Sequence, residues 1–439
     1  MNCFVSMDSI ALFWFRRDLR LDDNHGLYRA LTSGKRVLLT YIFDLDDWFS
    51  QGFNDQRVAF VRHELEQIRQ ALSAFQSDVA VRVGHALEEL YKLCEQYSVT
   101  DVYVNREYEP QKIKRDELIH NELKKRSINL FSYNDHLILK PDAVLKSDGT
   151  PYQVFTPYSR KWREIYNDLN PPEYPSEIHL SALWPMDAET QPTKGLENCP
   201  KLEESRIPPK KIKPAMLRTY GTTRNEVFNE EGTSGLGVHL RYGTVSPRIK
   251  FKGSAQYSEV FTTELIWREF FASILYHFPR VITESFRTEY DRIKWRNNEQ
   301  EFQHWKDGTT GYAIVDAGMR QLNQTGQMHN RVRMIVASFL VKYLLIDWRW
   351  GEAYFAEKLM DYDLASNNGN WQWAAGTGVD AAPYFRVFNP ISQQQKFDPK
   401  QAYIRKWVPD EMNGKIPEMV DLKFSRERCL EVYKQALNA

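Results

Sequence analysis

The first 135 residues alternate short apolar runs with segments of helical periodicity, and this alternation constrains the fold more than any other feature of the chain. The apolar runs predict strands at 9–15, 36–43, 79–84, 100–105 and 129–134. Helical spacing of apolar residues predicts helices at 59–72, 86–97 and 112–126. Buried strands separated by helices are typical of a parallel sheet covered on both faces. We therefore expect an α/β, Rossmann-like domain over residues 9–135, although no GxGxxG dinucleotide motif follows its first strand.

The pattern changes twice in the rest of the chain. Residues 136–214 contain Pro-rich breaks such as PPEYP and IPPKKIKP, which favour a long surface connector. Residues 215–439 show no strand signal, and their long periodic segments predict an all-helical domain. The expected helices of this domain lie at 263–278, 312–326, 329–346 and 351–361.

Length and composition agree with two domains in the reduced interior of a cell. At 439 residues the chain exceeds the roughly 250 to 300 residues at which single cores stop growing. Its four cysteines form no CxxC pair, which argues against a metal framework and against disulfides. No apolar run approaches the roughly 18 residues that a membrane span needs, so we expect a soluble cytoplasmic protein. Lys plus Arg equals Asp plus Glu at 58 each, which excludes a uniformly basic surface but not a local basic cleft.

Polar and aromatic side chains are concentrated in the helical half, where eight of the twelve Trp lie after residue 260. Glu264, Trp267 and Arg268 are spaced to share one face of a helix. Asn330 and Arg331 begin an otherwise apolar helical segment, where polar side chains and backbone N–H groups can converge on a ligand. Taken alone, each pattern is also consistent with a solvated helix surface, and the stripe of Glu264, Trp267 and Arg268 favours that interpretation.

Two further stretches suggest a ligand. GTSGLG at 232–237 resembles a loop that binds phosphate through hydroxyls and backbone N–H groups, but no Lys follows, so it is not a Walker A sequence. NNGNWQW at 367–373 places amides and two indoles together. This second stretch favours a binding surface for a large, flat molecule with polar edges.

Taken together, six motifs give the chain a specific family resemblance. The sequence resembles the photolyase/cryptochrome flavoproteins nearly from end to end, and it is most similar to a microbial class I-type cyclobutane pyrimidine dimer photolyase. The motifs are ALFWFRRDLRLDDNHGL (11–27), DGTPYQVFTPYSRKW (148–162), ELIWREF (264–270), KDGTTGYAIVDAGMRQLNQTGQMHNRVRM (306–334), IDWRWGE (346–352) and YIRKWVPDE (403–411), together with the stretch around NNGNWQW.

The resemblance implies light-driven DNA repair by a carbon–carbon lyase. Reduced, photoexcited FAD in the helical domain would pass an electron to a dimer that has left the duplex, and the electron would return after the ring has split. Arg333 and Asp361 would form an ion pair beside the flavin ring, and Asn367 would face its N5 atom. The full set of expected FAD neighbours is Tyr220, Thr233, Ser234, Gly235, Leu236, Gly237, Glu264, Arg268, Asn330, Arg333, Asp361, Asp363 and Asn367.

The resemblance also assigns residues to the damaged DNA. A flipped pyrimidine dimer needs aromatic walls and a few polar groups. Trp267 and Trp373 would form the walls, Glu264 and Asn330 would hydrogen-bond the base edges, and Met334 would pack against the dimer. The flanking phosphates would bind Arg224, Arg331 and Arg386.

A separate implied function is light-driven reduction of oxidised FAD. Trp295, Trp348 and Trp371 match the family's electron-transfer chain from the surface to the flavin. Members of the family use a methenyltetrahydrofolate, a deazaflavin or a second flavin as antenna chromophore, or no antenna at all. Asn105, Glu107 and Glu109 are plausible neighbours of an antenna, and they are equally consistent with a strand end. UV-damaged DNA is the expected partner of a monomeric protein that binds no metal, needs no protein partner and contacts no membrane.

The chain departs from the family pattern at one loop. TSGLG stands at 233–237 where relatives usually have TSRLS, so two side chains near the FAD phosphates are replaced by Gly235 and Gly237. Three alternatives remain within the family. A (6-4) photolyase carries a His pair where this chain has Asn330 and Met334, and a DASH-type enzyme usually lacks the second Trp, here Trp373. A blue-light cryptochrome that signals through a partner commonly has a long C-terminal extension, whereas about thirty residues follow KWVPDE here.

Overall fold

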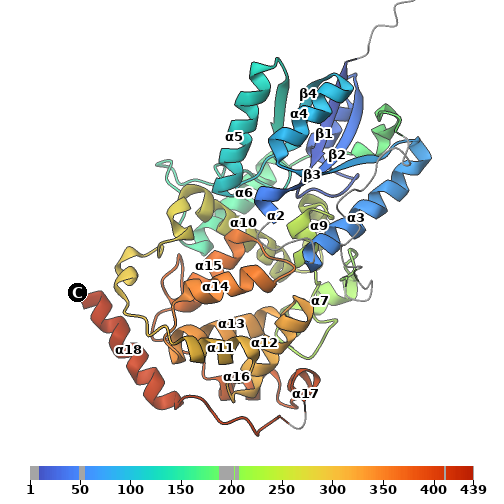
Figure 1. The fold of residues 1–439 in the computed structure, drawn as a ribbon. Helices are drawn as coiled ribbons and strands as arrows, with labels where there is room; N and C mark the ends of the chain where they lie inside the picture. Colours follow the sequence, from blue (N-terminus) through green and yellow to red (C-terminus); the bar gives the residue numbers. More distant parts are fainter. Residues whose placement is uncertain (1–8, 49–54, 187–201, 203–206, 410–411, 439) are drawn as a thin grey trace, which may run out of the picture. The chain divides into compact units, whose positions relative to one another are not determined.

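The chain forms two compact units, which we call the sheet unit and the helical unit (Figure 1). The computed structural model describes residues 9–48, 55–186, 202, 207–409 and 412–438. The sheet unit takes in the chain up to Lys140, together with Ile165–Lys210 and Leu236–Gly253. The helical unit consists of Pro141–Glu164, Lys211–Gly235 and Ser254–Ala439.

The sheet unit is built on five parallel strands in the order β3-β2-β1-β4-β5. This confirms the predicted parallel α/β fold, and each strand begins and ends within one residue of its expected range. The strands are β1 (Ile10–Phe15), β2 (Arg36–Asp44), β3 (Val79–Gly84), β4 (Val99–Asn105) and β5 (Asn129–Tyr133). The order reverses between β1 and β4, as in doubly wound sheets.

Helices cover both faces of this sheet because alternate strand residues point to opposite sides. Leu12 and Leu38 share a core cluster with Leu90 and Leu93 on one face. On the other face, Gly26 lies so close to the Phe13 ring that an added Cβ would come within 2.9 Å of it. The helices of this unit include α1 (His25–Leu31), α2 (Leu45–Trp48), α3 (Gln56–Leu72), α4 (Ala86–Tyr97), α5 (Pro110–Lys125) and α8 (Gly237–Tyr242), with most of α9 (Pro247–Ala255).

A buried ion network ties the segment 236–253 into the sheet unit. Arg248 pairs with Asp23 at 3.0 Å and with Asp135 at 2.8 Å, and Arg20 pairs with the same Asp135 at 2.7 Å. Burial by itself would raise the Asp135 pKa, but the two guanidinium charges outweigh it and hold the pKa at about 2. The compact units therefore differ from the expected boundaries, since part of the predicted helical domain and Ile165–Lys210 of the predicted connector belong with the sheet.

Helices make up nearly all of the regular structure in the described part of the helical unit, as predicted. They include α7 (Pro214–Thr223), α10 (Glu259–His277), α11 (Glu299–Asp307), α12 (Ala313–Thr325), α13 (Asn330–Ser338), α14 (Trp348–Lys358), α15 (Leu364–Ala375), α16 (Pro390–Phe397), α17 (Ala402–Trp407) and α18 (Leu422–Asn438). The helix α6 (Phe155–Leu169) begins in this unit. The single helix expected over 329–346 is wrong in one respect: α13 ends at Ser338, and the turn Phe339–Tyr343 is a π-helix.

Two glycines permit close packing around α15. A Cβ on Gly351 would come within 2.1 Å of the Trp371 ring, and one on Gly369 within 2.2 Å of the Phe271 ring. These contacts place α14 and α10 directly against α15. Among the described residues, no helix is long and apolar enough to cross a membrane.

Candidate functional site

The helix α10 presents three of the predicted site residues on one stripe. Its N-cap is Ser258, whose hydroxyl accepts a hydrogen bond from the Phe261 backbone N–H. Glu264, Trp267 and Arg268 follow at the predicted spacing and are each partly exposed. This helical stripe is therefore partly open, whereas Leu265, Ile266 and Glu269 beside it on α10 are buried.

The partly exposed indole of Trp267 has one face covered by a neighbouring ring. Phe155, at the start of α6, stacks on Trp267 with ring centroids 3.6 Å apart and planes 7° from parallel. Phe155 is itself 8% exposed, so it acts as a rigid backing for the indole. Phe155 was not predicted as a site residue, although it lies in the motif DGTPYQVFTPYSRKW.

The N-terminus of α13 carries a second group of predicted residues. Its N-cap is His329, whose Nδ1 accepts from the Arg331 backbone N–H at 3.1 Å. Asn330 is exposed, and the Arg331 guanidinium donates to Asn225 Oδ1 at 2.7 Å and lies 3.5 Å from Met334 Sδ. Burial, followed by the charges of nearby arginines, lowers the pKa of His329 to about 4. The His329 ring is therefore neutral at pH 7.

The structure contains the Arg333–Asp361 ion pair that the resemblance implies. Arg333 Nη2 lies 2.9 Å from Asp361 Oδ2, and Arg333 Nε donates to the Met328 carbonyl at 2.8 Å. The two side chains remain 27% and 21% exposed. This pair joins the start of α13 to the segment before α15 and leaves part of both charged groups accessible.

The helix α15 explains the local roles of Asp363 and Asn367. Asp363 is its N-cap and accepts from the Ser366 backbone N–H at 3.0 Å. Asn367 is buried, and its Nδ2 donates at 3.0 Å to both the backbone oxygen and Oε1 of Glu352. Burial raises the pKa of Glu352 despite that hydrogen bond. Since its Nδ2 is engaged by Glu352, Asn367 is held in one orientation by a residue that the sequence analysis did not select.

Other amides of the same stretch have structural partners. Gln372 Nε2 and Asn368 Nδ2 both donate to the Val281 carbonyl at 2.9 Å, and Gln372 Oε1 accepts from the Phe286 backbone N–H at 2.8 Å. The expectation that the amides of NNGNWQW serve a ligand is thus wrong for Asn368 and Gln372, because a neighbouring loop requires their hydrogen bonds.

The four predicted tryptophans near α14 and α15 differ in exposure. Trp348 is 0% and Trp371 2% exposed, whereas Trp295 and Trp373 are partly buried. All four pack in or against one core cluster. The rings of Trp295 and Tyr433 lie 6.0 Å apart between centroids, and those of Trp373 and Phe388 lie 6.4 Å apart. Of the three tryptophans that the resemblance assigns to an electron path, Trp295 is therefore the most exposed, whereas Trp348 and Trp371 are buried.

Residues at the end of α7 approach α10. Tyr220 lies 5.3 Å from Phe261 between ring centroids, and the C-cap residue Arg224 forms an ion pair with Glu264. Burial, reinforced by the negative charge of Glu264, raises the pKa of Tyr220 to about 12. The structure thus brings together Arg224, which was expected at DNA phosphates, and Glu264, which was expected at the lesion.

The remaining predicted residues are more scattered. Thr233 and Ser234 are partly exposed and Gly235 has φ +63°, all three within the helical unit. Leu236 and Gly237 fall in the sheet unit. Arg386 is exposed on the loop after α15.

The expected antenna neighbours have partners inside the sheet unit. Asn105 is buried, and its Nδ2 donates to Asp18 Oδ2 at 2.6 Å. Glu109 pairs with Arg17 at 2.7 Å and with Arg241 at 2.8 Å. These interactions account structurally for Asn105 and Glu109.

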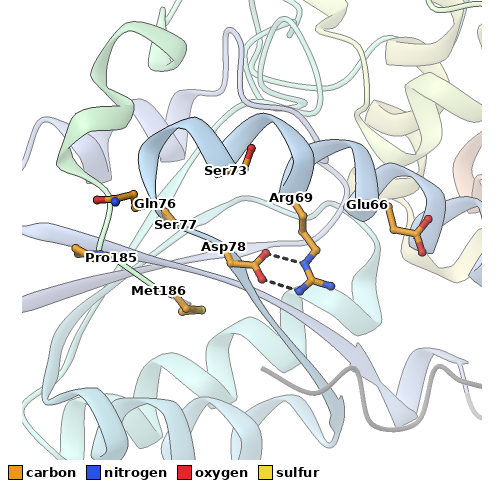
Figure 2. Close-up of a pocket in the computed structure, with 8 residues that line it drawn as sticks. All are labelled: Glu66, Arg69, Ser73, Gln76, Ser77, Asp78, Pro185 and Met186. Carbon is orange, nitrogen blue, oxygen red and sulfur yellow. Dashed lines mark hydrogen bonds and ion pairs between the residues drawn. The ribbon is translucent and has the colours of Figure 1, made fainter. Parts of the chain in front are cut away.

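A pocket of about 710 Å³ lies elsewhere in the sheet unit, at the end of α3 and the start of β3 (Figure 2). Its lining contains none of the predicted site residues. Arg69 and Asp78 satisfy each other there through two hydrogen bonds of 2.7 and 2.6 Å. The lining residues are Glu66, Arg69, Ser73, Gln76, Ser77, Asp78, Pro185 and Met186.

One group of potential metal ligands occurs within the described ranges, made of Asp44, Asp46 and His85. Asp46 and His85 are exposed and contact each other at 3.2 Å, while Asp44 lies 3.5 Å from Arg115. No further observation connects this group with an ion.

Comparisons with known proteins agree with the resemblance. A family model described as DNA photolyase matches residues 11–176, and one described as FAD binding domain of DNA photolyase matches residues 261–419. A deoxyribodipyrimidine photo-lyase of Vibrio cholerae is 36% identical over 97% of this chain and 100% of its own length. A bacterial class III photolyase structure from Agrobacterium tumefaciens matches all of both chains with 31% identity and a TM-score of 0.86. An archaeal photolyase structure from Sulfolobus tokodaii is 33% identical to this chain, with a TM-score of 0.79, and the match covers 97% of this chain and 100% of that one. That structure is described as having two FAD molecules, with the implication of a novel light-harvesting cofactor.

Proposed function

The chain belongs to the photolyase/cryptochrome family, and from this membership we propose that it is a deoxyribodipyrimidine photo-lyase that repairs cyclobutane pyrimidine dimers in DNA with light. The observation that carries the proposal is the stripe on α10. Glu264 and Trp267 stand one turn apart there, and Phe155 supports the indole from behind. A carboxylate beside a braced aromatic ring suits a ligand that is flat and apolar but has polar edges, as a pyrimidine dimer is.

The residues of the helical unit fit the FAD that the family binds. A flavin ring has polar atoms along its edges, and the Arg333–Asp361 pair offers a partly exposed guanidinium and carboxylate for them. Asn367 adds a carboxamide whose Nδ2 is already held by Glu352, so its oxygen remains available as an acceptor. His329 Nε2 is buried and has no hydrogen-bond partner among the described residues, as expected for a polar site that a ligand completes.

When bound, FAD supplies light absorption and the transferable electron. The chain's own residues position the substrate. Glu264 and Asn330 would hydrogen-bond the base edges of the dimer, Trp267 and Trp373 would enclose it, and Met334 would pack against it. Because the dimer must leave the duplex to reach such a pocket, damaged and weakly paired bases are favoured over intact ones.

Further residues are proposed to assist this reaction. Arg224, Arg331 and Arg386 would hold the backbone phosphates, since guanidinium groups bind them with two parallel hydrogen bonds. A path through Trp295, Trp348 and Trp371 would renew reduced FAD after oxidation. The expected antenna chromophore stays a proposal, supported by the light-harvesting cofactor described for the Sulfolobus relative. We propose that the enzyme acts in the cytoplasm as a monomer.

The proposal is tested with purified protein whose FAD has been reduced chemically. An oligonucleotide containing one cyclobutane dimer is illuminated with blue light, and the recovery of base absorbance is followed with a dark sample as control. We expect light-dependent loss of the dimer and a spectrum with flavin bands, plus any antenna band. Glu264→Ala should lower the repair yield while FAD stays bound. Flavin photoreduction without loss of dimers from single-stranded or duplex DNA would instead indicate a blue-light sensor.

A further inference from the structure

The ion pair between Arg224 and Glu264 joins two residues that are proposed to bind different parts of the DNA. Arg224 Nη1 donates to Glu264 Oε1, and the side chains are 26% and 33% exposed. Arg224 is the C-cap of α7, whereas Glu264 lies in the second turn of α10. The pair is thus accessible from solvent, and neither residue is locked in the core.

The charged residues around the Arg224–Glu264 pair have partners of their own. Asp361 is already paired with Arg333, and Arg331 is held by Asn225, the neighbour of Arg224. Burial, and after it the charge of Arg224, lower the pKa of Arg331. Since His329 is neutral at pH 7, the local positive charge comes from the arginines. Glu264 therefore neutralises one positive charge of an arginine cluster. Without Glu264 this charge would attract DNA phosphates.

From this arrangement, and on the basis of the proposed function, we infer that the Arg224–Glu264 pair determines the preference for damaged DNA. Undamaged DNA offers phosphates to Arg224 but keeps its bases stacked, so releasing Arg224 would leave the Glu264 carboxylate without its ion-pair partner. A flipped dimer offers a phosphate to Arg224 and a base-edge N–H to Glu264 at the same time. Both partners of the broken pair are then satisfied, whereas with intact DNA only one of them is.

The inference predicts that removing the carboxylate improves binding to the wrong DNA. Glu264→Gln removes the counter-charge of Arg224, and we expect the affinity for an undamaged duplex to rise about 2- to 5-fold at low salt, the range of a partly exposed ion pair. The slope of log K against log salt concentration for that duplex should become steeper by about 0.9, the value of one additional phosphate contact. The ratio of the affinity for the damaged duplex to the affinity for the undamaged duplex should therefore fall.

The test measures fluorescence anisotropy of two labelled duplexes that differ by one cyclobutane dimer, using the FAD-loaded protein in the dark. Glu259→Gln is the matched control, because Glu259 lies on the same helix, is 85% exposed and has Arg163 rather than Arg224 as its partner, at 3.9 Å. Arg224→Gln and the double variant Arg224→Gln/Glu264→Gln complete the set. In the Arg224→Gln background, Glu264→Gln should have no larger effect on undamaged DNA than Glu259→Gln.

The outcomes separate the inference from the proposed function. If the wild type prefers and repairs damaged DNA but Glu264→Gln and Glu259→Gln change undamaged binding equally, the pair does not set the preference and the inference is overturned. The inference is also overturned if Glu264→Gln raises the affinity for undamaged DNA equally in the wild-type and the Arg224→Gln backgrounds. If the wild type neither prefers nor repairs damaged DNA, the proposed function is overturned, and the inference with it.

Discussion

Trp267 and Phe155 lie face to face, with ring centroids 3.6 Å apart, although 112 positions separate them in the chain. The stack connects the start of α6 with the middle of α10 and leaves Trp267 partly exposed while Phe155 is buried. A wall residue of a binding pocket must keep its orientation when the pocket is empty. The covered face of Trp267 provides this rigidity.

Phe155→Leu should weaken the binding of damaged DNA. The substitution keeps an apolar side chain but removes a stacked ring pair, which is worth about 0.5–1.5 kcal/mol beyond burial. We expect the affinity for a duplex containing a dimer to fall about 3- to 10-fold while the FAD content is unchanged. Phe302→Leu removes a ring from another near-parallel Phe–Trp pair, that of Phe302 and Trp305 with centroids 5.7 Å apart, and should leave DNA affinity intact. Equal losses in both variants would mean that general destabilisation, rather than the Trp267 wall, is responsible.

Asp361→Asn should weaken the retention of FAD. It leaves the Arg333 guanidinium without its counter-charge at the proposed flavin edge, and we expect the dissociation constant of FAD to rise about 10-fold. Flavin fluorescence after dilution measures the released cofactor. Asp291→Asn is the control, because it breaks the similarly exposed Arg349–Asp291 pair of 2.8 Å elsewhere in the helical unit. If FAD is retained equally by both variants, Asp361 does not contribute to the flavin site.

Gly351→Ala should destabilise the packing of α14 on α15. A Cβ at this position would come within 2.1 Å of the Trp371 ring, and overpacking of this kind costs about 1–3 kcal/mol. Urea denaturation followed by Trp fluorescence measures the free energy of unfolding. In Gly221→Ala, on α7, the nearest atom to the new Cβ lies at 3.8 Å, so this control should be neutral or more stable by about 0.5–1 kcal/mol. A neutral Gly351→Ala would show that Trp371 can shift without loss.

Acidification should destabilise the protein through His329. Its pKa is lowered to about 4 in the folded chain, whereas an unfolded His titrates near 6.5. Below pH 6.5 the unfolded state therefore binds more protons, so stability is lost as the pH falls from about 6.5 to about 4. His329→Asn keeps a side chain that can cap α13 but cannot titrate. When the pH falls from 7.5 to 5, both proteins should lose unfolding free energy. The loss should be smaller in the variant than in the wild type, by on the order of 1 to 2 kcal/mol. Identical losses would show that other groups cause the acid sensitivity.

Trp295→Phe should slow light-driven reduction of oxidised FAD without affecting repair by chemically reduced enzyme. Trp295 is the partly exposed member of the proposed path, and phenylalanine is much harder to oxidise than tryptophan. Flavin absorbance during blue illumination with an added thiol measures the reduction rate, which we expect to fall at least about 10-fold, a barrier increase of roughly 1.4 kcal/mol or more. Trp350→Phe, which removes another Trp packed against the same core cluster, should have little effect. Loss of both photoreduction and repair in Trp295→Phe would show that Trp295 has been assigned to the wrong role.

The sequence by itself determined the secondary structure and the family. Strand and helix periodicities are local properties of the chain, so β1 to β5 were predicted within one residue, and α3, α4, α5, α10, α12 and α14 within four residues, of their observed bounds. The helices α6 and α15 were not predicted. The motifs around Glu264, Asn330 and Asn367 are long enough to identify the family without any coordinates. The break of α13 into a π-helix at Phe339 was not predicted, because the apolar pattern continues unchanged through it.

Only the tertiary structure decided which partners the site residues have. The contacts of Trp267 with Phe155, of Asn367 with Glu352 and of Glu264 with Arg224 join segments that are distant in the sequence, and neither residue of a pair carries a local signal of the other. The same holds for Gln372, whose amide is used by the loop at Phe286 rather than by a ligand. Differences of a few tenths of an ångström decide whether a hydrogen bond or an ion pair forms. The packing of the helices sets these distances, and the periodicity along one helix does not encode that packing.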